Sequence, residues 1–121
     1  MKGQSMSLTV FSRLDRLLLE AEVAPGSREE FSRRYRTATG VDAFATEYCQ
    51  IQPDKWGIEC RVYFDAEDWV VESLERLGYH VEDRLGGGYR SDYMYRINSQ
   101  ELFWRLVEHG YRLGPNEPIA A

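Results

Sequence analysis

The chain has 121 residues, of which 43% are hydrophobic, 29% charged and 13% aromatic, and its net charge at pH 7 is −5. This size and composition fit a single globular domain with an ordinary hydrophobic core, and they exclude a chain that is disordered over most of its length. No run of 18 apolar residues is present, and residues 1–7 lack the apolar segment of a signal peptide. We therefore expect one small, acidic, cytoplasmic domain over residues 1–121, with loosely ordered ends at 1–7 and 114–121.

The first expected element is a helix over residues 8–23, followed by a stop at Pro25 and Gly26. Leu8 and Leu19 fall on the side of this helix opposite to its apolar face. At helical spacing the apolar face carries Val10, Leu14, Leu17, Leu18 and Ala21.

A second helix is expected between Ser27 and Gly40. Ser27 and Glu30 form a capping box at its start, and Gly40 stops it. The arginines along this helix are interpreted as a solvated surface. They are Arg28, Arg33, Arg34 and Arg36.

Two strands are expected over residues 44–52 and 58–64, with turn-forming residues between them that favour a hairpin. In the second strand, apolar and polar side chains alternate, which predicts one buried and one solvated face. If the strands pair as a hairpin, Cys49 faces Cys60. In a reducing compartment both are expected to be free thiols, and a disulfide between them is the alternative.

The second half of the chain reads as strand, helix, strand, strand, helix, strand. After the strand at 58–64, these elements are expected at 66–77, 79–85, 89–97, 100–109 and 111–113. Asp65 is expected to cap the first of the two helices, and Asn98 or Ser99 the second. An internal repeat supports this interpretation, because an apolar helix stripe, a glycine stop and an aromatic residue occur twice at an interval of 32 residues. Val70, Leu74, Gly78, Tyr79 and Val81 recur as Leu102, Leu106, Gly110, Tyr111 and Leu113.

This order of elements from residue 58 onward resembles the ferredoxin-like split βαβ arrangement, which implies an antiparallel sheet with both helices on one face. In that arrangement the first strand lies between the third and the fourth. The strand at 44–52 therefore competes with the short last strand for one flank of the strand at 58–64. We predict an α+β fold with a mainly antiparallel sheet and helices packed on one face, preceded by two N-terminal helices and an extra strand.

The sequence contains no recognisable catalytic or metal-binding pattern. His80 and His109 have no nucleophile close in sequence, and Cys49 and Cys60 match no metal-ligand spacing. The glycines at 86–88 precede a strand and not a helix, so they predict a turn and not a phosphate loop. We expect no cofactor and no metal, and a small enzyme with an unrecognised site remains a third hypothesis.

A second hypothesis is a module that binds single-stranded nucleic acid on the open face of the sheet. Charged residues alternate with the tyrosines of the strand at 89–97, so Tyr89, Tyr93 and Tyr95 are expected to face the helices. The outward face then provides the binding residues. They are Arg61, Tyr63, Arg84, Arg90 and Arg96.

The leading hypothesis is a non-enzymatic protein-binding protein, either a self-associating regulatory module or an inhibitor of a larger assembly. Trp69 and Trp104 lie off the apolar stripes of their helices, and tryptophan is enriched at interface hot spots. The alternative is that these side chains lie flat on neighbouring elements, including the N-terminal helices. The expected partner-binding residues are Trp56, Trp69, Trp104, Leu8 and Leu19.

Overall fold

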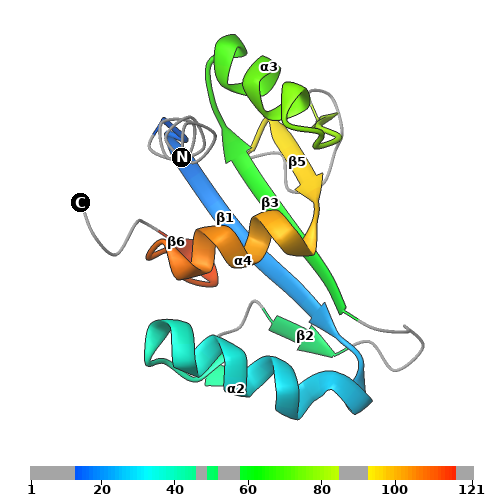
Figure 1. The fold of residues 1–121 in the computed structure, drawn as a ribbon, viewed down its shortest axis with the longest axis vertical. Helices are drawn as coiled ribbons and strands as arrows, with labels where there is room; N and C mark the ends of the chain where they lie inside the picture. Colours follow the sequence, from blue (N-terminus) through cyan, green and yellow to red (C-terminus); the bar gives the residue numbers. More distant parts are fainter. Residues whose placement is uncertain (1–12, 46–48, 52–57, 85–92, 117–121) are drawn as a thin grey trace.

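The computed structural model describes residues 13–45, 49–51, 58–84 and 93–116. It is an α+β fold in which helices pack on one face of a mainly antiparallel sheet (Figure 1). The strands are β1 (Arg16–Val23), β2 (Cys49–Ile51), β3 (Ile58–Asp65), β4 (Glu82–Asp83), β5 (Tyr95–Asn98) and β6 (Gly114–Asn116). The helices are α2 (Arg28–Thr39), α3 (Asp68–Arg76) and α4 (Gln100–Glu108), with short 3₁₀ turns η1 (Pro25–Ser27) and η2 (Ala43–Ala45).

The strand order in the sheet is β2-β1-β3-β5-β4. β1 is parallel to β2 and antiparallel to β3, and β3 and β4 each pair antiparallel with β5. β6 also pairs antiparallel with β1, on the edge that β2 uses, because β3 occupies the whole of the other edge. Figure 1 shows α4 across the middle of the sheet, with α2 near one end of the molecule and α3 near the other.

The expectation of a helix over residues 8–23 is wrong for residues 16–23, which form β1. Side chains of β1 alternate between the two faces of the sheet, and Leu17, Leu19 and Val23 point into the core. Leu19 is 0% exposed, so it is a core residue and not a partner-binding residue. The cause is tertiary: β1 pairs along all eight of its residues with β3, which satisfies its backbone groups on that edge.

The predicted hairpin between the strands at 44–52 and 58–64 does not form. Cys49 of β2 and Cys60 of β3 both pair with Ala21, but from opposite edges of β1. Their Cα atoms are therefore two strand spacings apart, about 9.5 Å. A disulfide requires less than about 7 Å, so the alternative of a Cys49–Cys60 bridge is excluded in the folded chain.

The three helices lie where the sequence predicts them, but two of the predicted caps are absent. Ser27 makes no side-chain capping bond to α2, and Asp65 does not cap α3, where Glu67 occupies the cap position. Asp65 instead accepts a hydrogen bond from the Met94 amide at 2.7 Å and pairs with Arg16 at 2.6 Å. The predicted Ser99 cap is present, since its hydroxyl accepts from the Leu102 amide at 3.2 Å.

The internal repeat corresponds to two helix ends of the same geometry. Gly78 and Gly110 follow α3 and α4 with φ angles of 104° and 110°, a conformation that favours glycine. The amide of Tyr79 bonds to the Leu74 carbonyl at 3.1 Å, and the amide of Tyr111 bonds to the Leu106 carbonyl at 3.0 Å. Both ends are therefore Schellman-type caps, as a glycine stop followed by a residue that closes the turn predicts.

The ferredoxin-like order is not confirmed. β3, β5 and β4 are neighbours as that arrangement requires, but β1 takes the flank of β3 where the last strand would lie. The last strand forms at 114–116 and not at 111–113, and it pairs with Leu17 and Leu18 of β1. Residues 114–116, expected to belong to a loose end, are thus part of the sheet. The expectations for residues 1–7, for the turn at 86–88 and for residues 117–121 concern segments outside the described residues.

Candidate functional site

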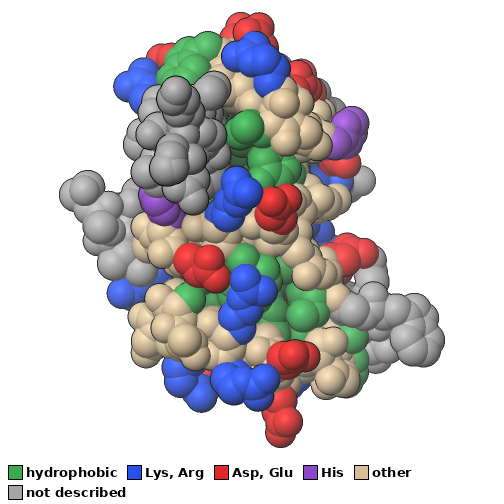
Figure 2. Space-filling view, viewed as in Figure 1, with side chains coloured by type: hydrophobic (Ala, Val, Ile, Leu, Met, Phe, Trp, Pro, Cys, Tyr) green, Lys and Arg blue, Asp and Glu red, His purple; other side chains and the backbone are tan. Residues whose placement is uncertain are grey.

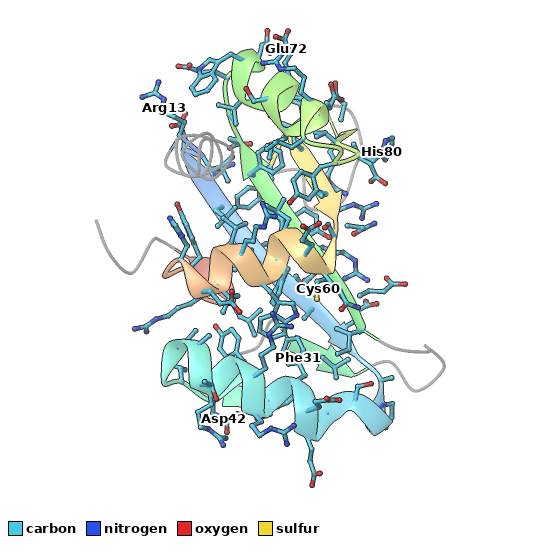
Figure 3. All side chains as sticks on the ribbon, viewed as in Figure 1. Arg13, Phe31, Asp42, Cys60, Glu72 and His80 are labelled. Carbon is cyan, nitrogen blue, oxygen red and sulfur yellow. The ribbon has the colours of Figure 1, made fainter. Side chains whose placement is uncertain are left out.

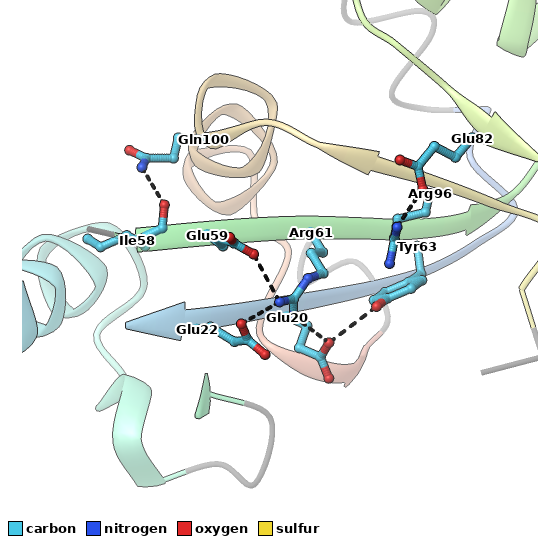
Figure 4. Close-up of polar contacts among 9 residues, drawn as sticks. All are labelled: Glu20, Glu22, Ile58, Glu59, Arg61, Tyr63, Glu82, Arg96 and Gln100. Carbon is cyan, nitrogen blue, oxygen red and sulfur yellow. Dashed lines mark hydrogen bonds and ion pairs between the residues drawn. The ribbon is translucent and has the colours of Figure 1, made fainter. Parts of the chain in front are cut away.

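The face of the sheet opposite the helices carries a group of ion pairs centred on Arg61 of β3 (Figure 4). Its guanidinium donates to Glu20 of β1 at 3.2 Å, and it pairs with Glu22 at 2.5 Å and with Glu59 at 3.2 Å. Burial alone would lower the pKa of Arg61, but the hydrogen bond to Glu22 and the charges of neighbouring groups raise it above its ordinary value. Glu20 is only 4% exposed. Arg61 therefore compensates carboxylates of its own chain.

Tyr63 lies next to this group and joins it to the strands at the other edge of the sheet. Its hydroxyl donates to Glu20 at 3.4 Å, and the Arg84 guanidinium lies 5.3 Å from the centre of its ring. The ring of Tyr93 is 6.4 Å away. Tyr63 is 3% exposed, so its ring has no face free for stacking on a base.

These contacts weaken the case for a nucleic-acid interface. The structure brings Arg84 and Arg96 close to Tyr63, as predicted, but Arg96 donates twice to Glu82, at 2.9 and 2.5 Å. An arginine held by a carboxylate is not available to neutralise a phosphate. Arg90 lies outside the described residues.

The tyrosines of the predicted strand at 89–97 do not all face the helices. Tyr95 does, since its ring packs on Phe64 at 5.5 Å against the core. Tyr93 contacts Tyr63 and lies beneath the Arg16 guanidinium, which is 4.4 Å from its ring centre. The expectation is wrong for Tyr93 because regular pairing of β5 begins only at Tyr95. Tyr89 lies outside the described residues.

Trp104 is 6% exposed and belongs to the core, so the expectation that it is a surface residue is wrong. α4 is covered on two sides, by the sheet and by α2, and its buried arc is wider than the stripe that the sequence predicts. The Trp104 ring packs on Phe31 of α2 at 5.0 Å. The Arg34 guanidinium covers it at 4.2 Å and pairs with Glu108 at 3.2 Å. An open groove of about 320 Å³ lies over this contact between α2 and α4.

Trp69 remains at the surface, as the sequence predicts. It is 36% exposed, and Leu77, which directly follows α3, is 40% exposed; they are the large exposed hydrophobic side chains of the described residues. The indole N–H of Trp69 donates to Glu67 at 2.6 Å, and the Arg13 guanidinium lies 5.8 Å from its ring while pairing with Glu67 at 3.5 Å. The indole ring is therefore held in one orientation. Trp56 and Leu8 lie outside the described residues.

Leu77 was not among the predicted site residues. It continues the apolar stripe of Val70 and Leu74 beyond the point where the helix covers the core. Eight residues along a helix correspond to about 12 Å of rise and about 80° of rotation, so Trp69 and Leu77 lie at the two ends of α3, about a quarter turn apart. The signal in the sequence was an apolar side chain directly before the Gly78 stop.

Acidic side chains lie on the outward side of α3, adjacent to Trp69. Asp68, Glu72 and Glu75 are exposed on α3, and within the described residues none of them forms an ion pair. Figure 3 shows Glu72 pointing outward from the end of the molecule, with Arg13 nearby. Figure 2 shows hydrophobic side chains at this end bordered by charged ones. We call Trp69, Leu77, Asp68, Glu72 and Glu75 the α3 surface.

The described residues hold no arrangement that indicates catalysis. His80 and His109 are both exposed, and Figure 3 shows His80 directed away from the sheet. Within residues 13–45, 49–51, 58–84 and 93–116, no group of three or more potential ligands is placed to hold a metal ion. No described helix combines the length and the apolar character needed to cross a bilayer. The chain matches no known protein family, no curated protein and no solved structure.

Proposed function

We propose that this chain is a protein-binding module and that the α3 surface is where its partner docks. The observation that carries this proposal is the exposure of two large apolar side chains, Trp69 and Leu77, at the two ends of a single helix. Burying an exposed tryptophan ring against a partner is favourable, because it removes a large apolar surface from water. Tryptophan is also among the residues most often found at the centre of interfaces. A role as a regulatory module or inhibitor needs no catalytic group of its own.

The fixed orientation of Trp69 supports this use. Its N–H is bound by Glu67, and Arg13 lies over its ring, so little side-chain freedom remains to be lost when a partner binds. Side-chain ordering is one of the costs that reduce affinity, and a preorganised aromatic ring avoids most of it. Trp69 is thus suited to act as an anchor.

The test is affinity capture from the native host with four forms of the chain. They are the wild type, Trp69→Phe, which keeps an aromatic ring, Leu77→Ser, and the double variant Trp69→Ala with Leu77→Ser. We expect a protein that is retained by the wild type and by Trp69→Phe, and that is lost from the double variant. With purified components, the double variant should raise Kd by about 100-fold, as expected for loss of hot-spot residues.

Circular dichroism must show that the double variant keeps its fold, since Trp69 and Leu77 make few core contacts. The proposal is overturned if the identified partner binds the folded double variant as tightly as the wild type. It is also overturned if cross-linking places the partner on another face of the molecule.

A further inference from the structure

We infer that the partner of the α3 surface is a different protein that presents lysine and arginine side chains next to apolar ones. This inference rests on the proposed function and specifies the chemistry of the partner. It depends on the charges that α3 leaves uncompensated.

Many charges of this chain are neutralised internally. Arginines on the sheet and on the other helices pair with carboxylates of their own chain, at distances from 2.5 to 3.6 Å. These pairs include Arg16–Asp65, Arg34–Glu108, Arg36–Asp42, Arg96–Glu82 and Arg105–Glu101.

Arg13, which lies over the Trp69 ring, is compensated by Glu67. α3 itself differs, because it exposes three carboxylates that have no ion-pair partner among the described residues and only one arginine. That arginine, Arg76, donates to the Ser73 hydroxyl at 3.4 Å. By helical spacing the carboxylates lie on the outward side of α3, adjacent to Trp69, and Leu77 lies on the side that carries Val70 and Leu74. An interface is stabilised when opposite potentials meet across it, so this surface favours a cationic partner.

The same charges argue against the other occupants. A second copy of the chain would bring its own Asp68, Glu72 and Glu75 against this surface, and the whole chain carries a net charge of −5. Like charges placed opposite each other are strongly unfavourable at an interface. A nucleic acid would add phosphates to an acidic surface and is disfavoured for the same reason.

The position of α3 makes this surface accessible. α3 forms one end of the molecule and stands clear of α2 and α4, so neither of these helices covers its outward side (Figure 1).

The first experiment uses a random dodecapeptide phage library as the probe, selected on the wild-type chain and counter-selected on the folded Trp69→Ala, Leu77→Ser variant. We expect the selected peptides to combine apolar residues with a net positive charge. Neutral or acidic peptides would overturn the inference while leaving the proposed function standing. A library that yields no peptide dependent on Trp69 and Leu77 would count against both.

The second experiment measures the selected peptides against two charge-reversal variants. Glu72→Lys with Glu75→Lys changes the α3 surface. Glu29→Lys with Glu30→Lys makes the same change of net charge on α2, near the opposite end of the molecule. We expect the first variant to weaken binding by at least about tenfold and the second by less than about twofold, with a steep loss of affinity at high salt for the wild type.

Equal effects of the two charge-reversal variants would show that only net charge matters and would overturn the inference. Sedimentation of the wild-type chain and of the Trp69→Ala, Leu77→Ser variant tests whether a second copy of the chain is the partner. A dimer that the Trp69→Ala, Leu77→Ser variant abolishes would support the α3 surface as an interface but would identify a second copy, and not a basic protein, as its partner.

Discussion

The hydroxyl oxygen of Tyr35, in α2, accepts a 2.8 Å hydrogen bond from the backbone amide of Leu113. Tyr35 is fully buried, and Leu113 directly precedes β6. This bond therefore fastens the C-terminal strand of the sheet to a helix that lies 78 residues earlier in the sequence. No local pattern in either segment indicates it.

Replacing Tyr35 with phenylalanine should destabilise the fold by about 1–3 kcal/mol, because the buried amide of Leu113 then has no acceptor. Urea denaturation measures the change. Tyr79→Phe is the matched control, since that hydroxyl makes no hydrogen bond among the described residues, and it should change stability by less than about 0.5 kcal/mol. Equal effects of the two substitutions would show that the bond to Leu113 is unimportant.

Removing Arg61 should be among the most damaging single changes in the molecule. Arg61→Met removes the guanidinium that pairs with buried Glu20 and with Glu22 and Glu59. The expected loss is about 3–5 kcal/mol, the cost of breaking a buried ion pair by removing one partner. In a double-mutant cycle, adding Glu20→Gln should recover at least about 1 kcal/mol, and strictly additive effects would contradict the pairing.

The two tryptophans of the helices should respond differently to truncation. Trp104→Ala opens a cavity between α4 and Phe31 and should cost about 3–5 kcal/mol, whereas Trp69→Ala should cost less than about 1.5 kcal/mol. Acrylamide quenching checks the exposure directly. In a Trp56→Phe background only Trp69 and Trp104 emit. The part of the emission that disappears when Trp69 is replaced with phenylalanine should be the part that acrylamide quenches more strongly.

The thiols should remain unlinked in the folded chain under oxidation. Cys60 is 2% exposed, and β1 separates it from Cys49. Peptide mapping after diamide treatment of the native protein should find no Cys49–Cys60 bridge. The same treatment in urea is the control, because unfolding removes the separation that β1 imposes. A bridge formed at native conditions would contradict the register of β1 with both strands.

Stability should fall at alkaline pH. Burial raises the pKa of Tyr111, Tyr79 and Tyr95 above the ordinary value of 10.0, so the folded state holds these phenolic protons more tightly than the unfolded state. Their stabilising contribution is therefore complete below the unfolded pKa and is lost as the pH rises through the folded values. Urea unfolding measured between about pH 8 and about pH 11 should show the decline, and Tyr111→Phe should make it shallower.

Several elements were predictable because short-range interactions decide them. α2, α3 and α4 lie where the helical spacing of apolar residues places them, and Gly40, Gly78 and Gly110 end them with positive φ angles. β3 follows from its alternation of apolar and polar residues. In each case the deciding contacts span a few residues, so a window of sequence contains them.

The candidate site was only partly predictable. Trp69 is exposed as its position on the helix indicates, but Trp104 has an equally displaced position and is buried. The difference is that α2 covers α4 and leaves the outer side of α3 uncovered. A helical stripe identifies the face that meets the sheet, and it carries no information about a second helix packing on another face.

Local sequence patterns were enough to predict the α+β class and the three helices with their glycine stops. They did not predict that residues 16–23 are a strand, that Cys49 and Cys60 lie on opposite edges of it, or that Arg61 pairs with three glutamates, because each of these depends on contacts between distant segments. Leu17 to Val23 satisfies both a helical and an alternating pattern, and pairing with β3, more than 30 residues away, selects between them. Such pairing is cooperative and long-range, so it becomes visible only when the whole sheet is assembled.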